Sequence, residues 1–243
     1  MESPLHHFEL HPLVHLSLMG FDISINKAII AMWVALAIVF GLFMLVVKNG
    51  THLIPGKLQS VLEMALGFVR EMVDEFIGKE EGPKYFPFVV TLFFFILACN
   101  LIGMIPGSYT ITSQLVVTGT FAGCIFILTL IIGFAKHGFK FLGIFVPPGV
   151  PKIMIPFMIP IEIISMLARP ISLSVRLFAN MTAGHTVLFV LFGLAMSASL
   201  AIGWVPFGFT VIINGLELAI AFIQAYIFTI LTCVYIGDVI HLH

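Results

Sequence analysis

Charge is the scarcest property of this 243-residue sequence: only 9% of its residues are Asp, Glu, Lys or Arg, against about 25% in an average soluble protein. Hydrophobic residues make up 60% of the chain, and the mean hydropathy is +1.15. So few charged side chains could not cover a water-facing surface, which excludes an ordinary soluble domain. The formal net charge is −1. With Lys and Arg scattered between apolar runs, it also excludes a nucleic-acid binder that neutralises phosphates.

Cysteine is scarce too, and the three present lie inside apolar runs, where we expect packing residues and neither a disulfide framework nor a metal site. They are Cys99, Cys124 and Cys233. The sequence has no Walker A loop, no GxSxG motif and no Gly-rich dinucleotide loop. We therefore expect the chain itself to hold no cofactor and to hydrolyse neither nucleotides nor esters.

The N-terminal segment does not have the composition of a signal peptide, because it has no early Lys or Arg and polar residues interrupt it. Its histidines do not form the HExxH zinc motif. We expect a solvated or interfacial tail there, without metal. These histidines are His6, His7, His11 and His15.

Long apolar runs, by contrast, are abundant, and about 20 apolar residues in a helix span a bilayer. Three runs of this length lie at 28–47, 85–105 and 115–135, and two longer ones at 161–202 and 206–240. We predict an all-α integral membrane protein, a single transmembrane domain over 1–243 with about five membrane-embedded helices. Before the fourth run we predict a loop or a broken entry, because proline removes helix donors. The prolines of this stretch are Pro147, Pro148, Pro151, Pro156 and Pro160.

Residues 57–77 follow a different pattern, in which apolar residues recur at helical spacing and charged residues mostly fall between them. This pattern predicts an amphipathic helix that lies at the membrane interface or against a partner. Its apolar members are Val61, Leu62, Ala65, Phe68, Val69, Met72, Val73 and Phe76.

Loop charge predicts the orientation. The connections 48–84 and 136–152 carry Lys and Arg, whereas 106–114 and 203–206 carry none. By the positive-inside rule the two basic connections face the cytoplasm or the matrix. The N-terminus is then outside and the C-terminus inside, as five crossings require. No internal repeat is visible, which argues against an inverted-repeat transporter.

The last two runs are too long for perpendicular crossings. The segment 161–202 would measure roughly 60 Å as a helix at about 1.5 Å per residue, whereas the hydrocarbon core is about 30 Å thick. Joined by a short turn, the two segments predict a long, steeply tilted hairpin. Such a hairpin would suit a surface wrapped around another membrane object.

The fourth run also carries an unusual set of polar residues. At about 100° per residue, Glu162, Arg169, Arg176 and Asn180 share one stripe, and His185 lies on roughly the opposite face. Arg169 precedes a proline and would lie near the inner interface, where its side chain can snorkel to water. Arg176 lies deeper and has no acid three or four residues away. Its counter-charge must therefore come from another helix or another chain.

The fifth run presents a second polar stripe, formed by Asn214, Glu217, Gln224 and Asp238. Glu217 lies between two leucines and is a candidate buried carboxyl group for carrying a proton. His185 is its natural second member, since imidazole titrates near neutral pH; the alternative is a hydrogen-bonded packing histidine.

These residues form a recognisable motif. The sequence PISLSVRLFANMTAGH at 170–185 resembles the signature of subunit a of F-type ATP synthases, and the resemblance covers nearly the whole chain. Other matching features are the sequence NLIGMIP at 100–106, Glu162 fourteen residues before Arg176, Gln224 in the last helix and the opening PLHHFE at 4–9. One departure is Gly103, where many members carry an acid, which weakens an outer-channel role for that span.

The resemblance implies a non-catalytic stator subunit that guides protons to the carboxylates of a rotating ring of c subunits. Arg176 would face the ring carboxylate and separate two offset half-channels. His185 and Glu217 would line the outer half-channel, with Asn214 and Gln224 as polar neighbours and Gln224 near Arg176. Glu162, Ser165 and Asn180 would belong to the inner one. The His185–Glu217 arrangement resembles the mitochondrial and alphaproteobacterial type.

The same resemblance implies partners and a location: the c-ring, b-type peripheral stalk subunits, the rest of the complex and the lipid bilayer. The membrane would be the bacterial cell inner membrane, with the mitochondrial inner membrane as the alternative. Two other classes compete, a self-contained proton-coupled transporter and an intramembrane hydrolase. The lack of repeats, the five crossings and the unpaired Arg176 argue against the first, and the lack of a nucleophile–base motif argues against the second. The ion is H⁺ or Na⁺.

Overall fold

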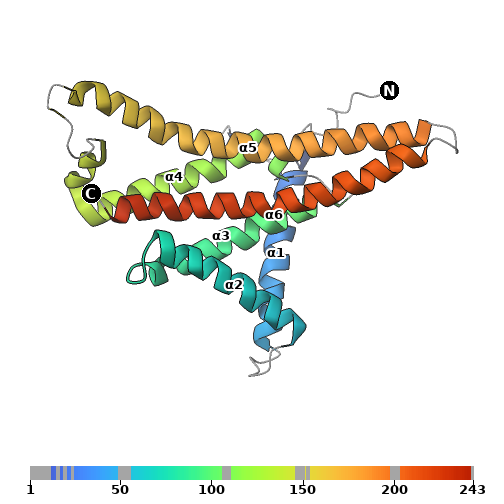
Figure 1. Cartoon of the computed structure of the whole chain (residues 1–243), viewed down its shortest axis with the longest axis horizontal. Coiled ribbons are helices and arrows are strands. Elements are labelled where there is room, and N and C mark those ends of the chain that lie inside the picture. The colour runs from blue at the N-terminus through green and yellow to red at the C-terminus, as the bar shows by residue number, and fades with distance from the viewer. Residues whose placement is uncertain are drawn as a thin grey trace. The chain divides into compact units, whose positions relative to one another are not determined.

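A computed structural model describes residues 12–14, 17–18, 21–22, 25–48, 56–105, 111–145, 151, 154–197 and 203–241. Six α-helices follow one another along these ranges (Figure 1). They are α1 (Lys27–Lys48), α2 (Lys57–Phe76), α3 (Gly82–Gly103), α4 (Leu115–His137), α5 (Ile155–Ser197) and α6 (Trp204–Ile240). Short 3₁₀ helices lie at η2 (Ile111–Ser113) and η3 (Gly138–Phe145).

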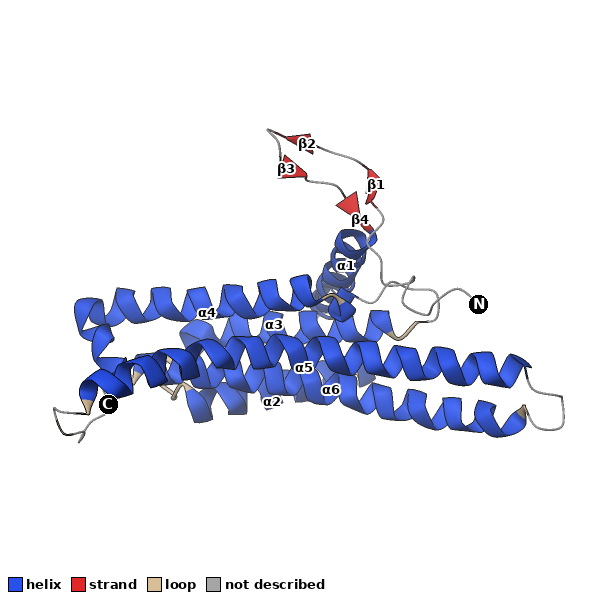
Figure 2. Ribbon diagram, turned by 90° about the horizontal axis from the view of Figure 1, so that it is seen from above, coloured by secondary structure: helices blue, strands red, loops and turns tan. Residues whose placement is uncertain are grey.

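Five of these helices, α1 and α3 to α6, are long and apolar enough to cross a membrane. The expectation of an all-α integral membrane protein is therefore confirmed. Four short strands near the N-terminus, which the sequence pattern does not predict, form two antiparallel pairs ahead of α1 (Figure 2). One pair is β1 (Pro12–Val14) with β4 (Ile25–Asn26), and the other is β2 (Ser17–Leu18) with β3 (Phe21–Asp22).

The prolines before the fourth run behave differently from the prediction of a loop or broken entry. Helix α5 already begins at Ile155, so it contains both Pro156 and Pro160. Pro156 lies in the first turn, where its missing N–H has no helical partner to lose. Pro160 and Pro170 lie in the helix interior, which is tolerated in membrane helices because neighbouring groups satisfy the freed carbonyls.

Several expectations fall outside the described residues. They concern the N-terminal histidines, the opening PLHHFE segment, Pro147, Pro148 and Lys152. Residues 106–110 of the predicted connection 106–114 and residues 198–202 of the predicted fourth run lie there as well.

Helix α2 is amphipathic, as its sequence pattern predicts. It begins at Lys57, as expected, and ends at Phe76, one residue before the predicted end. It buries Leu62, Val69, Met72 and Val73, whereas Val61 and Met64 are largely exposed. Apolar side chains therefore occupy more of its surface than the protein covers. This distribution suits a helix that lies at a membrane interface.

Backbone contacts divide the chain into two compact units, and α3, α5 and α6 contribute residues to both. Unit 1 comprises 1–52, 94–115 and 177–225, and unit 2 comprises 53–93, 116–176 and 226–243. In unit 1 small residues of α1, namely Ala28, Ala31 and Ala35, are buried. The ring of Phe43 meets that of Phe94 edge to face at 5.2 Å between centroids.

In unit 2 an acidic side chain outside the apolar spans ties helix ends together. Glu81 accepts hydrogen bonds from Lys84 Nζ at 2.8 Å and Lys136 Nζ at 3.0 Å. These two bonds to ammonium groups lower the pKa of the Glu81 carboxyl below its ordinary value. The connection before α3 is thereby fixed to the end of α4.

The last turn of α6 packs against the end of α2 in the same unit. A Cβ atom at Gly237 would collide with the backbone carbonyl of Phe76, so glycine allows this close approach. The His241 side chain is bonded to the Ile77 carbonyl at 2.9 Å, and the His137 ring lies 3.3 Å from the Ile240 carbonyl. Two imidazoles therefore hold the end of α6 in place.

We predict that Gly237→Ala lowers the amount of the protein that accumulates in membranes several-fold. The added methyl group meets rigid backbone, which cannot yield as a side chain can, and overpacking of this kind typically costs about 1–3 kcal/mol. Quantitative immunoblotting of membranes measures the effect. Gly208→Ala in the same helix is the matched control, because a Cβ there meets nothing within 4 Å. Equal accumulation of the two variants would contradict the packing role of Gly237.

Candidate functional site

Two titratable side chains meet inside unit 1. His185 Nδ1 of α5 lies 3.7 Å from Glu217 Oε1 of α6, and the two side chains are 12% and 3% exposed. This distance is within ion-pair range if the imidazole is protonated, but too long for a direct hydrogen bond. The predicted pairing of the buried carboxyl group with the histidine therefore appears in the structure as a close approach.

A glycine makes space for this carboxyl group. A Cβ atom on Gly184 would lie 2.9 Å from Glu217 Oε1 and 3.1 Å from its Cδ. Both distances are shorter than ordinary van der Waals contact. Because Gly184 directly precedes His185, the same turn of α5 provides the histidine and the space for its acidic neighbour.

Farther along α6 a second polar pair lies in unit 1. Asn180 Nδ2 donates a hydrogen bond to Gln224 Oε1 at 3.4 Å, and Gln224 is only 1% exposed. Asn214, predicted as a neighbour of Glu217, is exposed, and its Nδ2 donates to the Thr210 carbonyl of its own helix. The structure therefore joins Asn180 with Gln224, but it does not bring Asn214 into this group.

Several buried polar atoms in unit 1 lack a protein partner. Among the described residues, both carboxyl oxygens of Glu217, Gln224 Nε2 and Asn100 Oδ1 form no hydrogen bond. Buried polar groups are nearly always hydrogen-bonded, to protein or to water. These unpaired atoms lie on α3 and α6 of unit 1.

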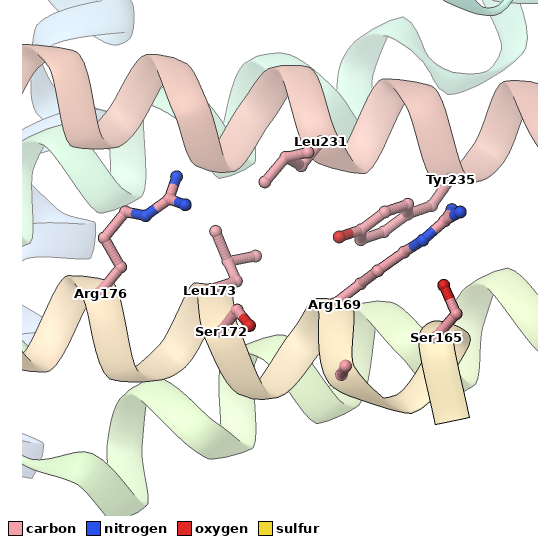
Figure 3. Close-up of a pocket in the computed structure, with 8 residues that line it drawn as sticks. Ser165, Arg169, Ser172, Leu173, Arg176, Leu231 and Tyr235 are labelled. Carbon is pink, nitrogen blue, oxygen red and sulfur yellow. The ribbon is translucent and has the colours of Figure 1, made fainter. Parts of the chain in front are cut away.

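Unit 2 contains a pocket of about 320 Å³ between its portions of α5 and α6. Arg169 and Arg176 extend from α5 towards α6, with Leu173 and Leu231 between them and Tyr235 beside Arg169 (Figure 3). Ser165, predicted from the family resemblance, also lines this pocket. Glu162 lies one turn before Ser165 in α5 and is half-buried.

The two arginines in this pocket have different surroundings. Arg169 Nη1 lies 3.3 Å from Asp238 Oδ2, and its guanidinium carbon lies 5.8 Å from the centroid of the Tyr235 ring. None of the ion pairs in the described part of the chain involves Arg176. The expectation that Arg176 lacks an acid within its own helix thus extends to the other described helices.

Sequence reasoning placed Asp238 on the stripe of α6 but did not pair it with Arg169. A signal was available, because each residue lies near the same predicted membrane face, at the start of one long segment and the end of the next. Sequence reasoning also left the roles of Tyr235 and Asn100 open. The described residues contain no group of three His, Cys, Asp or Glu side chains suited to a metal ion.

Comparison with known proteins identifies the family. A model described as ATP synthase A chain matches residues 29–237. The chain belongs to this family. A protein named ATP synthase subunit a from Magnetococcus marinus is 53% identical over 244 aligned residues, which cover 99% of this chain and 94% of that protein.

Further members of the family match over essentially their full lengths. The ATP synthase subunit a of Rhodospirillum rubrum is 46% identical over 243 residues, covering 100% of both chains. That of Pelagibacter ubique is 43% identical over 242 residues, covering 99% of this chain and 98% of the other. The resemblance found in the motif at 170–185 is therefore confirmed, and it extends along the whole sequence.

Proposed function

We propose that this chain is the proton-translocating stator subunit of a rotary F-type ATP synthase, in which proton flow to a ring of c subunits drives rotation and ATP synthesis. Its family membership supports this proposal, as do its five long apolar helices. As a member of its family it is a non-catalytic membrane subunit of the complex. The c-ring and b-type peripheral stalk subunits are its proposed partners.

The observation that carries the proposal is the difference between the two arginines of the pocket. A charged side chain at the bilayer centre costs at least about 2.5–3.5 kcal/mol, so such residues are paired or face water. Arg169 has Asp238, whereas Arg176 faces a pocket without an acid from the described helices. A carboxylate from outside this chain would pair with the Arg176 guanidinium, and a c-ring carboxylate is a partner of the required charge.

In this proposal Arg176 separates two half-paths. Glu217 and His185 carry protons on the outer side, with Gln224 as a polar neighbour; Asn214, which is exposed, takes no part. Glu162, Ser165 and Asn180 belong to the inner side. The prediction that Gln224 lies near Arg176 is part of this proposal. A fixed positive charge repels a proton that would pass directly between the half-paths and releases one from an arriving carboxylic acid.

The same proposal places the chain in the cell inner membrane as a multi-pass protein, with the N-terminus outside and the basic connections inside. Helix α5 has 43 residues and α6 has 37, or about 65 Å and 55 Å at 1.5 Å per residue. A hydrocarbon core of about 30 Å accommodates such lengths if both helices tilt steeply. A steep tilt would extend the surface that they offer to the rotor.

We predict that Arg176→Ala abolishes ATP-driven proton pumping by the assembled complex in reconstituted vesicles. The substitution removes both the barrier between the half-paths and the positive charge that would face the ring carboxylate. Fluorescence quenching of a pH-sensitive dye measures pumping. Arg70→Ala is the control, since Arg70 of α2 is exposed and lies outside the pocket. Coupled pumping that survives Arg176→Ala would refute the proposed function.

A second prediction concerns the pairing of His185 with Glu217. The exchange His185→Glu with Glu217→His should retain more ATP synthesis than His185→Ala or Glu217→Ala, because both titratable groups are preserved at the same place. Synthesis rates in vesicles, normalised to the amount of assembled complex, measure the effect. If the exchange loses as much activity as each alanine variant, the two residues do not act as a pair.

A third prediction follows from the space beside Glu217. Gly184→Ala should slow proton-coupled ATP synthesis by about tenfold, because the new methyl group pushes the carboxyl group from its place and overpacking costs about 1–3 kcal/mol. Gly193→Ala in the same helix is the control, since a Cβ there meets nothing within 4 Å. Similar synthesis rates for both variants would show that Gly184 does not position Glu217.

A further inference from the structure

The pocket in unit 2 carries more positive than negative charge. Arg169 and Arg176 both line it, and none of the described residues that line it is an acid. Asp238, which does not line the pocket, pairs with Arg169 at 3.3 Å. Of the two guanidinium charges one is therefore matched, and the charge of Arg176 is left for a ligand.

This pocket is open to the surface of the chain. Arg169, Ser172 and Arg176 are all exposed, and the volume of about 320 Å³ is many times the roughly 30 Å³ that one water molecule takes up in the liquid. Helices α5 and α6, which form the pocket, are both apolar enough to cross a membrane. A ligand can therefore enter it from the lipid phase.

A stripe of exposed apolar side chains runs along α5 beside the pocket. Its members recur at intervals of three or four residues, so they lie on one face of the helix. Each is at least 45% exposed, and each directly precedes a residue that lines the pocket. They are Ile164, Leu167, Ile171 and Val175. A ligand with an anionic group in the pocket can lay a hydrocarbon chain along this stripe.

Both arginines lie within reach of the phosphates of one lipid leaflet. They are seven residues apart, which is about 10 Å along the axis of α5. Helix α5 has 43 residues and fits a hydrocarbon core of about 30 Å only if it tilts steeply, so the difference in depth is about 5 Å. Snorkelling and local thinning of the bilayer bring arginine side chains and lipid phosphates together over such depths.

We propose that this pocket binds the phosphodiester of an anionic phospholipid when no rotor carboxylate occupies it. The single negative charge of a phosphodiester matches the free charge of Arg176, and its oxygens can accept two parallel hydrogen bonds from one guanidinium group. The hydroxyl groups of Ser172 and Tyr235 are further donors in the pocket. An acyl chain lies along the apolar stripe.

Such a lipid would supply the counter-charge that a lone arginine needs in a membrane helix. The chain could then remain in the bilayer before it joins a ring. Only the replacement of the lipid by a rotor carboxylate rests on the proposed function; the lipid site itself rests on the pocket, its unmatched charge and the apolar stripe.

The test uses the full-length chain, produced without c subunits, purified in a mild detergent and titrated with phosphatidylglycerol in native mass spectrometry. One phosphatidylglycerol should bind about fivefold more tightly than phosphatidylcholine with the same acyl chains, because the choline group offsets the phosphate charge. Arg176→Gln should weaken phosphatidylglycerol binding about tenfold, since a charge-assisted hydrogen bond is lost. Arg70→Gln is the control, because Arg70 is exposed and lies outside the pocket.

Asp238→Asn provides a readout with the opposite sign. It removes the carboxylate that matches Arg169, so the pocket gains a second free positive charge. Binding of phosphatidylglycerol should become several-fold tighter. If Arg176→Gln does not accumulate, this variant decides, and binding no tighter than that of the unmodified chain overturns the inference.

Three further outcomes overturn the inference. They are equal binding of phosphatidylglycerol and phosphatidylcholine, equal binding by Arg176→Gln and Arg70→Gln, and displacement of the lipid by excess inorganic phosphate, which would show a site for a free anion. Each can occur while Arg176→Ala still abolishes pumping, and the proposed function would then stand. Pumping that survives Arg176→Ala would instead remove the proposed function and leave the lipid site, which is measured without a ring.

Discussion

A charge inside an apolar helix has to be matched, and this requirement organises the polar residues of the chain. Arg169 is matched by the Asp238 carboxylate and lies against the ring of Tyr235, so its guanidinium needs nothing from outside. Arg176 projects into the same pocket with no acid of the described helices beside it. An unpaired arginine in a membrane helix either faces water or meets a negative charge supplied by a partner. The proposed function assigns that charge to the rotor.

Buried polar groups need hydrogen-bond partners in the same way. Glu217, Gln224 and Asn100 are almost fully buried, yet atoms of each lack a hydrogen-bond partner among the described residues. The helical repeat places Glu217 and Gln224 on one face of α6, and α3 and α5 supply the side chains opposite. Gly184 gives the Glu217 carboxyl group room that any side chain would take away. Spacing and residue size together leave a polar strip within an otherwise apolar packing.

Much of this arrangement could be predicted from the sequence, because apolar length and helical periodicity depend on local residues. The five spans, the amphipathic α2 and the approach of His185 to Glu217 were all foreseen. The prolines were misjudged: Pro156 fits the first turn of α5, where no helical hydrogen bond is lost, and Pro160 lies in the interior of a helix that continues through it. The pairing of Arg169 with Asp238 and of Asn100 with Ala221 depends on contacts 69 and 121 residues apart. No local sequence pattern predicts contacts between residues so far apart. The family resemblance, in contrast, was found from the motif at 170–185 as a whole.

The chemistry of the polar strip also limits where charge can rest. In the part of unit 1 formed by α5 and α6, the described titratable side chains are His185 and Glu217; Asn180, Gln224 and Asn100 are amides. An amide both donates and accepts hydrogen bonds without taking up a charge, so it can order water without adding a second buried ion. A proton path of the proposed kind, with one titratable pair followed by amides, confines the cost of a buried charge to a single place. In the proposed function, the pH dependence of proton entry should therefore follow this pair.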